Sequence, residues 1–221
     1  MPNGNMDEWL SSTRYKQPYY QPWSNESWWD TNNNVTMPKS YLTYPNYKCF
    51  PTTTYTESGV SGRAAIIRSV AVNGGNSEIM GSGENRGILY TGTTSDDGTM
   101  TEGREWTSRP SQLTFMYQYE SYDNEHFGAY IELISEDGTK IASGEYLSEK
   151  VSTTSYQKAN ITLRYTDETL KAFKIKIRFV SVADGESVST RKQTITIPAG
   201  SYKIYGGSVL TIDDISLIYD K

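Results

Sequence analysis

Strict alternation of apolar and polar side chains along two long segments is the feature that most restricts the fold of this chain. In residues 112–121 (QLTFMYQYES) every second side chain is apolar or aromatic, namely Leu113, Phe115, Tyr117 and Tyr119. In residues 171–183 (KAFKIKIRFVSVA) the apolar side chains alternate with a basic row, Lys174, Lys176 and Arg178. A period of two is typical of half-buried β-strands. We interpret the basic row as a solvated face.

Other strand-like runs occupy residues 63–72, 88–91, 127–135, 140–146, 155–165, 194–198 and 209–219. Asp137-Gly138, between two of these runs, predicts a tight hairpin. Only residues 167–170 have the character of a short helical segment. About eight to ten strands without a long amphipathic helix predict an all-β fold, an antiparallel β-sandwich of the jelly-roll kind.

We interpret residues 1–221 as a single jelly-roll domain, because no repeat or linker divides the chain. Residues 59–221 supply the sandwich strands, with the last strand returning beside the first. Residues 1–58 hold four of the five tryptophans and show no sustained period. They predict long aromatic loops, which either cover a sheet edge or form a wall for a ligand.

Composition excludes several classes of function. The net charge is -5 and the pI is near 5.0, so the chain lacks the basic surface of a nucleic-acid-binding protein. Cys49 and His126 are the single cysteine and histidine, which argues against disulfides, multi-histidine metal centres and a Ser-His-Asp triad. No apolar run of about 18 residues is present, so we expect no membrane-spanning segment. The first residues lack the pattern of a signal peptide, and we expect a mature domain.

Four segments, in the same order, are similar to motifs of carbohydrate-binding proteins. Residues 3–9 (NGNMDEW) resemble an N-G-x-F-E-x-W opening, residues 61–67 (SGRAAII) an S-G-x-x-A-x-x-L strand, and residues 210–217 (LTIDDISL) a D-D-(V/I)-x-L final strand. These are motifs of galactose-binding-like jelly-roll carbohydrate-binding modules. Residues 109–119 (RPSQLTFMYQY) resemble an R-P-x-x-L segment of a carbohydrate-metabolism domain family of gut Bacteroidetes.

The resemblance implies a metal site and a cellular setting. In such modules a carboxylate of the opening motif and one of the closing strand meet at a structural Ca²⁺, which would involve Asp7 with Asp213 or Asp214. Asp7 stands where the family usually has Glu, and a surface acidic pair without an ion is the alternative. The resemblance also implies an exported, surface-attached bacterial protein, with a further domain N-terminal to this one.

Aromatic residues and one arginine are the candidates for contact with a ligand: Trp23, Trp28, Trp29, Arg109, Tyr117 and Tyr119. Sugar rings present C–H faces that stack on indole, and a guanidinium donates a fork of hydrogen bonds to hydroxyls or a uronate. Neighbouring side chains of an extended segment point in opposite directions, so one of Trp28 and Trp29 is expected inside and the other outside. For Arg109, a buried pair with a core carboxylate is an equal alternative.

Acid/base catalysis has one candidate cluster, formed by Glu120, Asp123 and Glu125 beside His126. A glycosidase needs two carboxyl groups that flank the scissile bond. Acidic loop clusters are usually solvated, so a solvent-facing hairpin loop is the preferred interpretation and we assign no catalytic residue.

Three functions therefore follow from the sequence. The leading one is a non-catalytic domain that binds a polysaccharide or oligosaccharide for glycan capture at the cell surface. The second is a glycoside hydrolase, which would require convergent carboxylates. The third is a structural or adhesive surface domain, in which Trp28 and Trp29 would be buried and no groove would be open.

Overall fold

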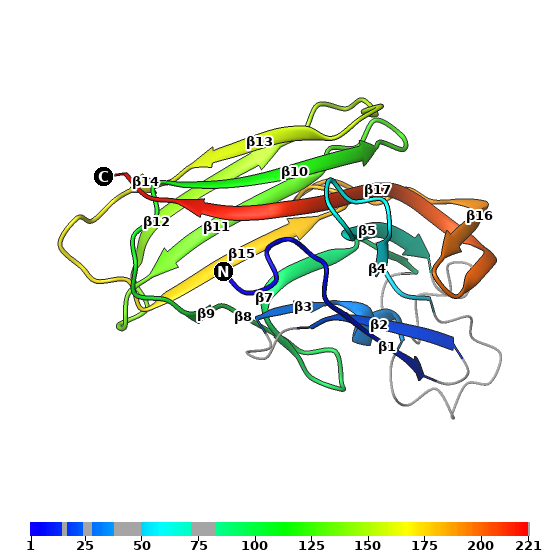
Figure 1. Ribbon diagram of the computed structural model, residues 1–221, viewed down its shortest axis with the longest axis horizontal. Helices are drawn as coiled ribbons and strands as arrows, with labels where there is room; N and C mark the ends of the chain where they lie inside the picture. Colours follow the sequence, from blue (N-terminus) through cyan, green and yellow to red (C-terminus); the bar gives the residue numbers. More distant parts are fainter. Residues whose placement is uncertain (15–16, 24–27, 38–49, 72–82, 221) are drawn as a thin grey trace.

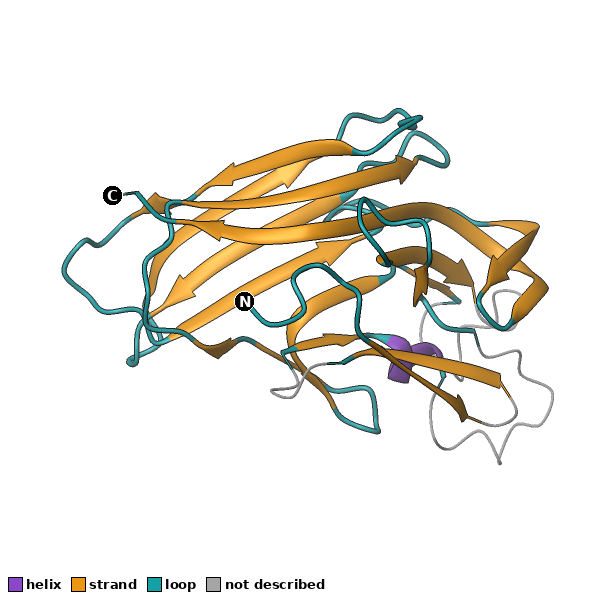
Figure 2. Cartoon of the chain, in the orientation of Figure 1, coloured by secondary structure: helices purple, strands orange, loops and turns teal. Residues whose placement is uncertain are grey.

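The computed structural model describes residues 1–14, 17–23, 28–37, 50–71 and 83–220. Within these ranges almost all regular structure is strand, and the helix α1 (Asn33–Thr36) is a single turn (Figure 2). None of the described helices has the length and apolar character needed to cross a membrane. The all-β prediction is confirmed.

One layer of the sandwich is a seven-stranded antiparallel sheet with β17 at its centre (Figure 1). Its order is β13 (Gln157–Thr162), β10 (Gln112–Glu120), β17 (Gly200–Ile218), β5 (Ala64–Ala71) and β4 (Thr53–Thr56). Two further strands extend it: β16 (Arg191–Ile197) pairs with β17, and β6 (Glu84–Asn85) pairs with β5. The last long strand thus lies between β5 and the pair β10 and β16.

The second layer is an eight-stranded sheet that carries the predicted hairpin. Its order is β14 (Arg164–Tyr165), β12 (Lys140–Leu147), β11 (Gly128–Ile134), β15 (Lys174–Val180), β7 (Ile88–Thr94) and β3 (Trp29–Thr31). Beside these, β8 (Met100–Glu102) pairs with β7 and β9 (Arg104–Glu105) pairs with β15. The β11–β12 turn closes through the Ser135 N–H, which donates to the Thr139 carbonyl over 2.9 Å.

Alternation decides which side chains enter the core between the two sheets. On β10 the inward side chains are the predicted ones, Leu113, Phe115, Tyr117 and Tyr119, all buried. On β11 and β15 the buried hydrophobic side chains are Ala129, Ile131, Leu133, Ile175, Ile177, Phe179 and Val180. Phe173 was expected in this row but is 41% exposed, because β15 begins only at Lys174.

The N-terminal part contains more regular structure than the sequence predicts. Residues 1–58 form β3, β4, α1 and a separate two-stranded sheet of β1 (Trp9–Arg14) and β2 (Gln17–Pro22), where long loops were expected. The β1–β2 hairpin covers a second hydrophobic cluster outside the main core, formed by Tyr20, Phe50, Val70, Ile195, Ile197 and Ile204. Short strands rich in Pro and polar residues have no clear period, and only packing on this cluster defines them.

Candidate functional site

Both residues of the tryptophan pair are buried, so the predicted outward ring is absent. Trp28 is 6% exposed and packs edge-on against Trp106, with 5.5 Å between ring centroids. Trp29 is 2% exposed, lies against Phe179, and donates its indole N–H to the Pro2 carbonyl over 3.0 Å. Pro2 and Trp106, both distant in sequence from the pair, thus contact the two indole rings. Only Trp23 of the three predicted tryptophans is exposed, at 41%.

The two predicted tyrosines belong to the core and cannot stack on a ligand. Tyr119 is fully buried and donates its hydroxyl to the Ser181 carbonyl over 3.0 Å. The hydroxyl of Tyr117 lies 2.9 Å from that of Tyr146. Burial raises the pKa of both phenols. Alternation on β10 predicts this inward position, and it places both rings away from the surface.

Arg109 has neither of its two expected roles. Its guanidinium donates to the carbonyls of Leu170 (2.6 Å) and Asp167 (2.8 Å) and lies over the Tyr165 ring at 4.4 Å. These bonds hold residues 167–170, which form a bend and not the expected short helix. The Asp167 carboxylate also accepts the backbone N–H groups of Thr169 and Leu170. Arg109 is therefore a fold-stabilising residue of this turn.

The acidic cluster after β10 is also structural. Glu125 is 4% exposed, contrary to the expected solvated loop, and accepts hydrogen bonds from the Ser189 N–H (2.6 Å) and from the Ser208 hydroxyl. Asp123 accepts the Ser189 hydroxyl, whereas Glu120 is exposed. Glu125 lies between the end of β10 and the start of β16. Its partner Ser208 belongs to a bulge of β17.

His126 follows this loop and pairs with a different carboxylate. Its Nδ1 lies 2.5 Å from Glu186 Oε1, and its backbone N–H donates to the other oxygen of Glu186. Of the three predicted carboxylates, Asp123 and Glu125 thus accept hydrogen bonds from the chain, and Glu120 is exposed.

Two of the aspartates assigned to calcium, Asp7 and Asp213, converge on one loop, residues 59–63. Asp7 Oδ1 accepts the Arg63 N–H over 2.7 Å. Asp213 is fully buried; its two oxygens accept the N–H groups of Val60 and Asp214, each over 2.7 Å. Burial raises the pKa of Asp213.

This donor set does not fit a calcium ion. Calcium requires six to eight oxygen ligands, whereas the groups that face these carboxylates are N–H donors. Among the described residues no three His, Cys, Asp or Glu side chains gather at this place. The carboxylates instead bind the 59–63 loop to both chain ends, and calcium stays an untested prediction.

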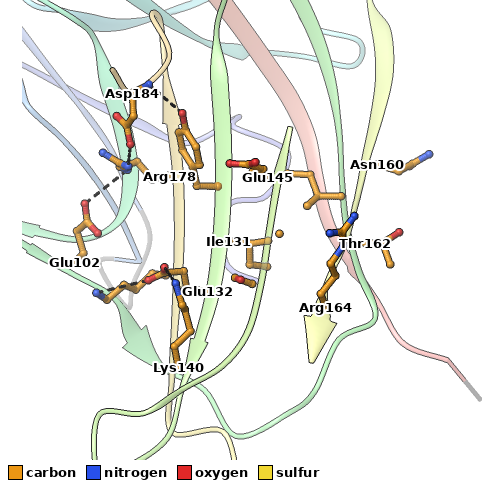
Figure 3. Close-up of a pocket in the computed structure, with 15 residues that line it drawn as sticks. Glu102, Ile131, Glu132, Lys140, Glu145, Asn160, Thr162, Arg164, Arg178 and Asp184 are labelled. Atoms are coloured by element: carbon orange, nitrogen blue, oxygen red, sulfur yellow. Dashed lines mark hydrogen bonds and ion pairs between the residues drawn. The ribbon is translucent and has the colours of Figure 1, made fainter. Parts of the chain in front are cut away.

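An open groove lies elsewhere, on the outer face of the eight-stranded sheet (Figure 3). It has a volume of about 750 Å³ and runs from Glu102 on β8 to Arg164 on β14. We call it the outer-face groove. Its side chains include the outward members of β11, β12 and β15, with the basic row Lys176 and Arg178, and also Asn160 and Thr162 of β13 in the other sheet.

Strand register aligns four polar side chains across the groove. Arg164 lies opposite Ser143, Ser143 opposite Glu132, and Glu132 opposite Lys176. Neighbouring strands are about 4.8 Å apart, so this row is roughly 14 Å long. Glu132 is fixed between two lysines, with Lys140 Nζ at 3.1 Å and Lys176 Nζ at 4.0 Å.

A second row contains the single aromatic ring of the groove. Tyr130 lies opposite Arg178 on one side and Glu145 on the other. A Cβ at Gly128 would be 2.5 Å from Tyr130 Oη, so the ring lies along β11 over this glycine. Tyr130 Oη accepts the Asp184 N–H over 3.0 Å, and the Arg178 guanidinium carbon is 4.9 Å from the ring centroid.

Ion pairs fix the charged side chains at one end of the groove, whereas two charged side chains toward the other end are unpaired. Arg178 pairs with Asp184 and, at 3.8 Å, with Glu102. Arg164 and Glu145 are exposed, and their side chains form no ion pair or hydrogen bond with any residue that the structure describes. Alternation in the sequence predicts that these side chains point outward, but it predicts only a solvated basic face. The register that sets Tyr130 opposite Arg178 and Glu132 opposite Lys176 cannot be read from the local sequence.

A scan against protein-family models and a search of curated proteins found no significant match. The resemblance to the Bacteroidetes family therefore stays a prediction.

Solved structures with a similar shape include carbohydrate-binding modules. The family 11 module of the Clostridium thermocellum cellulase Lic26A-Cel5E is 12% identical, with a TM-score of 0.37, and the match covers 76% of this chain and 81% of the module. The module TmCBM61, solved with β-1,4-galactotriose, is 9% identical with a TM-score of 0.36. The match covers 99% of this chain and 92% of the module. A CBM4 structure is 12% identical with a TM-score of 0.37, and the match covers 99% of this chain and 98% of that structure. These values are too low to transfer a function.

Proposed function

We propose that this chain is a non-catalytic carbohydrate-binding domain that holds a glycan in the outer-face groove. One observation carries the proposal: an open groove about 750 Å³ in volume whose lining is almost entirely hydrogen-bonding side chains around one ring laid along the sheet. Sites of this volume take a ligand of several rings, and the few polar groups that converge on it decide its orientation.

The chemistry of the lining suits a polyhydroxylated ligand. Sugar hydroxyls both donate and accept hydrogen bonds, and bonds to ionised groups are roughly twice as strong as those between neutral groups. Carboxylates, ammonium groups and two guanidinium groups line the groove together with Ser143. Tyr130, backed by Gly128 and held by Asp184, offers an apolar surface for the C–H face of a sugar ring.

Fixed ion pairs favour binding by a pre-ordered surface. Glu132 contacts two lysines and Arg178 contacts two carboxylates, so these side chains lose little freedom when a ligand arrives. A glycosidase acid, by contrast, is a carboxyl group whose apolar surroundings raise its pKa. Glu132 lies between lysines and Glu145 is exposed, which supports a binding role for both.

We further propose that the domain is part of an exported, surface-attached bacterial protein that captures glycans outside the cell, with another domain N-terminal to it. The support for this setting is the resemblance of both chain ends to exported modules.

Affinity electrophoresis tests the proposal. The purified chain is run through gels that contain a panel of plant and host polysaccharides, and the polymer length is measured afterwards. We expect retardation by at least one polymer without shortening. Tyr130→Ala should weaken that retardation about tenfold, as expected for a central aromatic contact. The matched control is Tyr205→Ala, which removes an exposed tyrosine (39%) on the other sheet.

Each other outcome has a definite meaning. Shortened polymer would show a glycoside hydrolase. If Trp23→Ala loses retardation and Tyr130→Ala keeps it, the site lies at the N-terminal aromatic residues. Absence of retardation by every polymer would contradict glycan binding and favour a structural or adhesive domain.

A further inference from the structure

The charges of the outer-face groove balance. Four carboxylates line it, Glu102, Glu132, Glu145 and Asp184. Four cations line it as well, Lys140, Arg164, Lys176 and Arg178. The whole chain has a net charge of -5, so the surrounding molecule adds no attraction for a polyanion.

Most of these charges are also neutralised in pairs. Three cations contact carboxylates: Lys140 and Lys176 share Glu132, and Arg178 contacts Glu102 and Asp184. Within the described part of the chain, Arg164 and Glu145 are the groove charges that remain without an ion pair, one of each sign. They are close in the sheet, because Arg164 pairs with Ser143, two residues before Glu145 on β12.

A charged ligand gains little from such a surface. It would give up hydration of its own charge, and each uronate or sulfate attracted by Arg164 would also face the Glu145 carboxylate. A neutral glycan has no such cost, while its hydroxyls still form charge-assisted hydrogen bonds with ionised side chains.

We infer that the ligand class of the groove is an uncharged polysaccharide, and that Glu145 excludes polyanionic glycans. This inference rests on the proposed function, because it concerns the ligand of the same site. Glu145 is then a specificity residue, and the ion-paired side chains of the groove supply hydrogen bonds to the hydroxyls of the neutral glycan.

Polymer pairs that share a backbone and differ in charge provide the test. The chain is run in affinity gels that contain hydroxyethylcellulose or its anionic partner carboxymethylcellulose, and fully methyl-esterified homogalacturonan or its anionic partner polygalacturonate. We expect the neutral member of a pair to retard the chain about tenfold more strongly than its anionic partner. Retardation by the neutral member should change less than about twofold between about 50 and 500 mM NaCl, because no net charge is screened.

One variant tests the role of Glu145 directly. Glu145→Gln leaves Arg164 unopposed and gives the groove a net positive charge, so it should gain several-fold retardation by the anionic polymers, lost again in high salt. Arg164→Gln should show no such gain. Glu168→Gln, which removes an exposed carboxylate in the 167–170 turn outside the groove, is the matched control.

The outcomes separate the two proposals. Stronger binding of an anionic member by the unaltered chain, or no gain in Glu145→Gln, would overturn the neutral-ligand inference and leave glycan binding in place. No retardation by any polymer of the panel would overturn both.

Discussion

The Tyr130 ring lies along β11 in space that Gly128 leaves free, since a Cβ at Gly128 would stand 2.5 Å from Tyr130 Oη. Gly128→Ala should therefore push the ring away from the sheet and weaken glycan retardation about as much as Tyr130→Ala. The stability cost should be small, about 1 kcal/mol, because the displaced group is the end of a side chain that can swing outward.

Tyr130→Phe provides the comparison for this prediction. It keeps the ring and removes only the hydroxyl that accepts the Asp184 N–H, so most of the binding should remain. Full binding by Gly128→Ala, measured in the same gels, would show that the position of the ring is unimportant.

The buried tryptophans should contribute to stability and not to binding. Trp29 is 2% exposed, and Trp29→Ala should lower the free energy of unfolding by about 3–5 kcal/mol through loss of its packing. Trp23→Ala, at an exposed position, should change it by less than about 0.5 kcal/mol. Urea denaturation measures both, and equal losses would contradict the burial described for Trp29.

Asp213 should stabilise the chain without calcium. Asp213→Ala leaves the N–H groups of Val60 and Asp214 without their acceptor, so we expect a loss of about 2 kcal/mol or more. Asp213→Asn keeps one acceptor oxygen and should lose less. Thermal melting should shift by less than about 1 °C when a chelator or calcium is added. A drop of several degrees on chelation would instead support the predicted ion.

Glu125 should make stability depend on pH in a specific direction. Burial raises its pKa in the folded chain, against the opposing effect of the hydrogen bonds from Ser208 and Ser189. The folded state then binds the proton more tightly than the unfolded state, whose glutamate has a pKa of about 4.3. The contribution of Glu125 to the free energy of unfolding is therefore largest below that value and declines as the pH rises through the folded pKa.

The comparison with Glu125→Gln isolates this effect, because the glutamine does not titrate. The difference in unfolding free energy between the two proteins, in favour of the unaltered chain, should be largest near about pH 4 and shrink towards about pH 7. Denaturant titrations across this range measure it. A difference that stays constant with pH would mean that burial does not shift the pKa of Glu125.

Local sequence determined the long strands of the sandwich and their faces. The period of two on residues 112–121 predicts the buried row that ends at Tyr119, and Asp137-Gly138 predicts the β11–β12 hairpin, because both depend on backbone geometry over a few residues. The same alternation placed Lys176 and Arg178 outward, as the structure has them.

Only the tertiary structure decided which outward and polar residues meet. Glu132 faces Lys176 and Ser143 because of the register of three strands, and Glu125 is buried because the ends of β10 and β16 leave a place for it against β17. Trp28 and Trp29 are buried by the N-terminal segment and Trp106, which are distant in sequence. Long-range pairing follows from the packing of whole sheets, and no local pattern of residues encodes it.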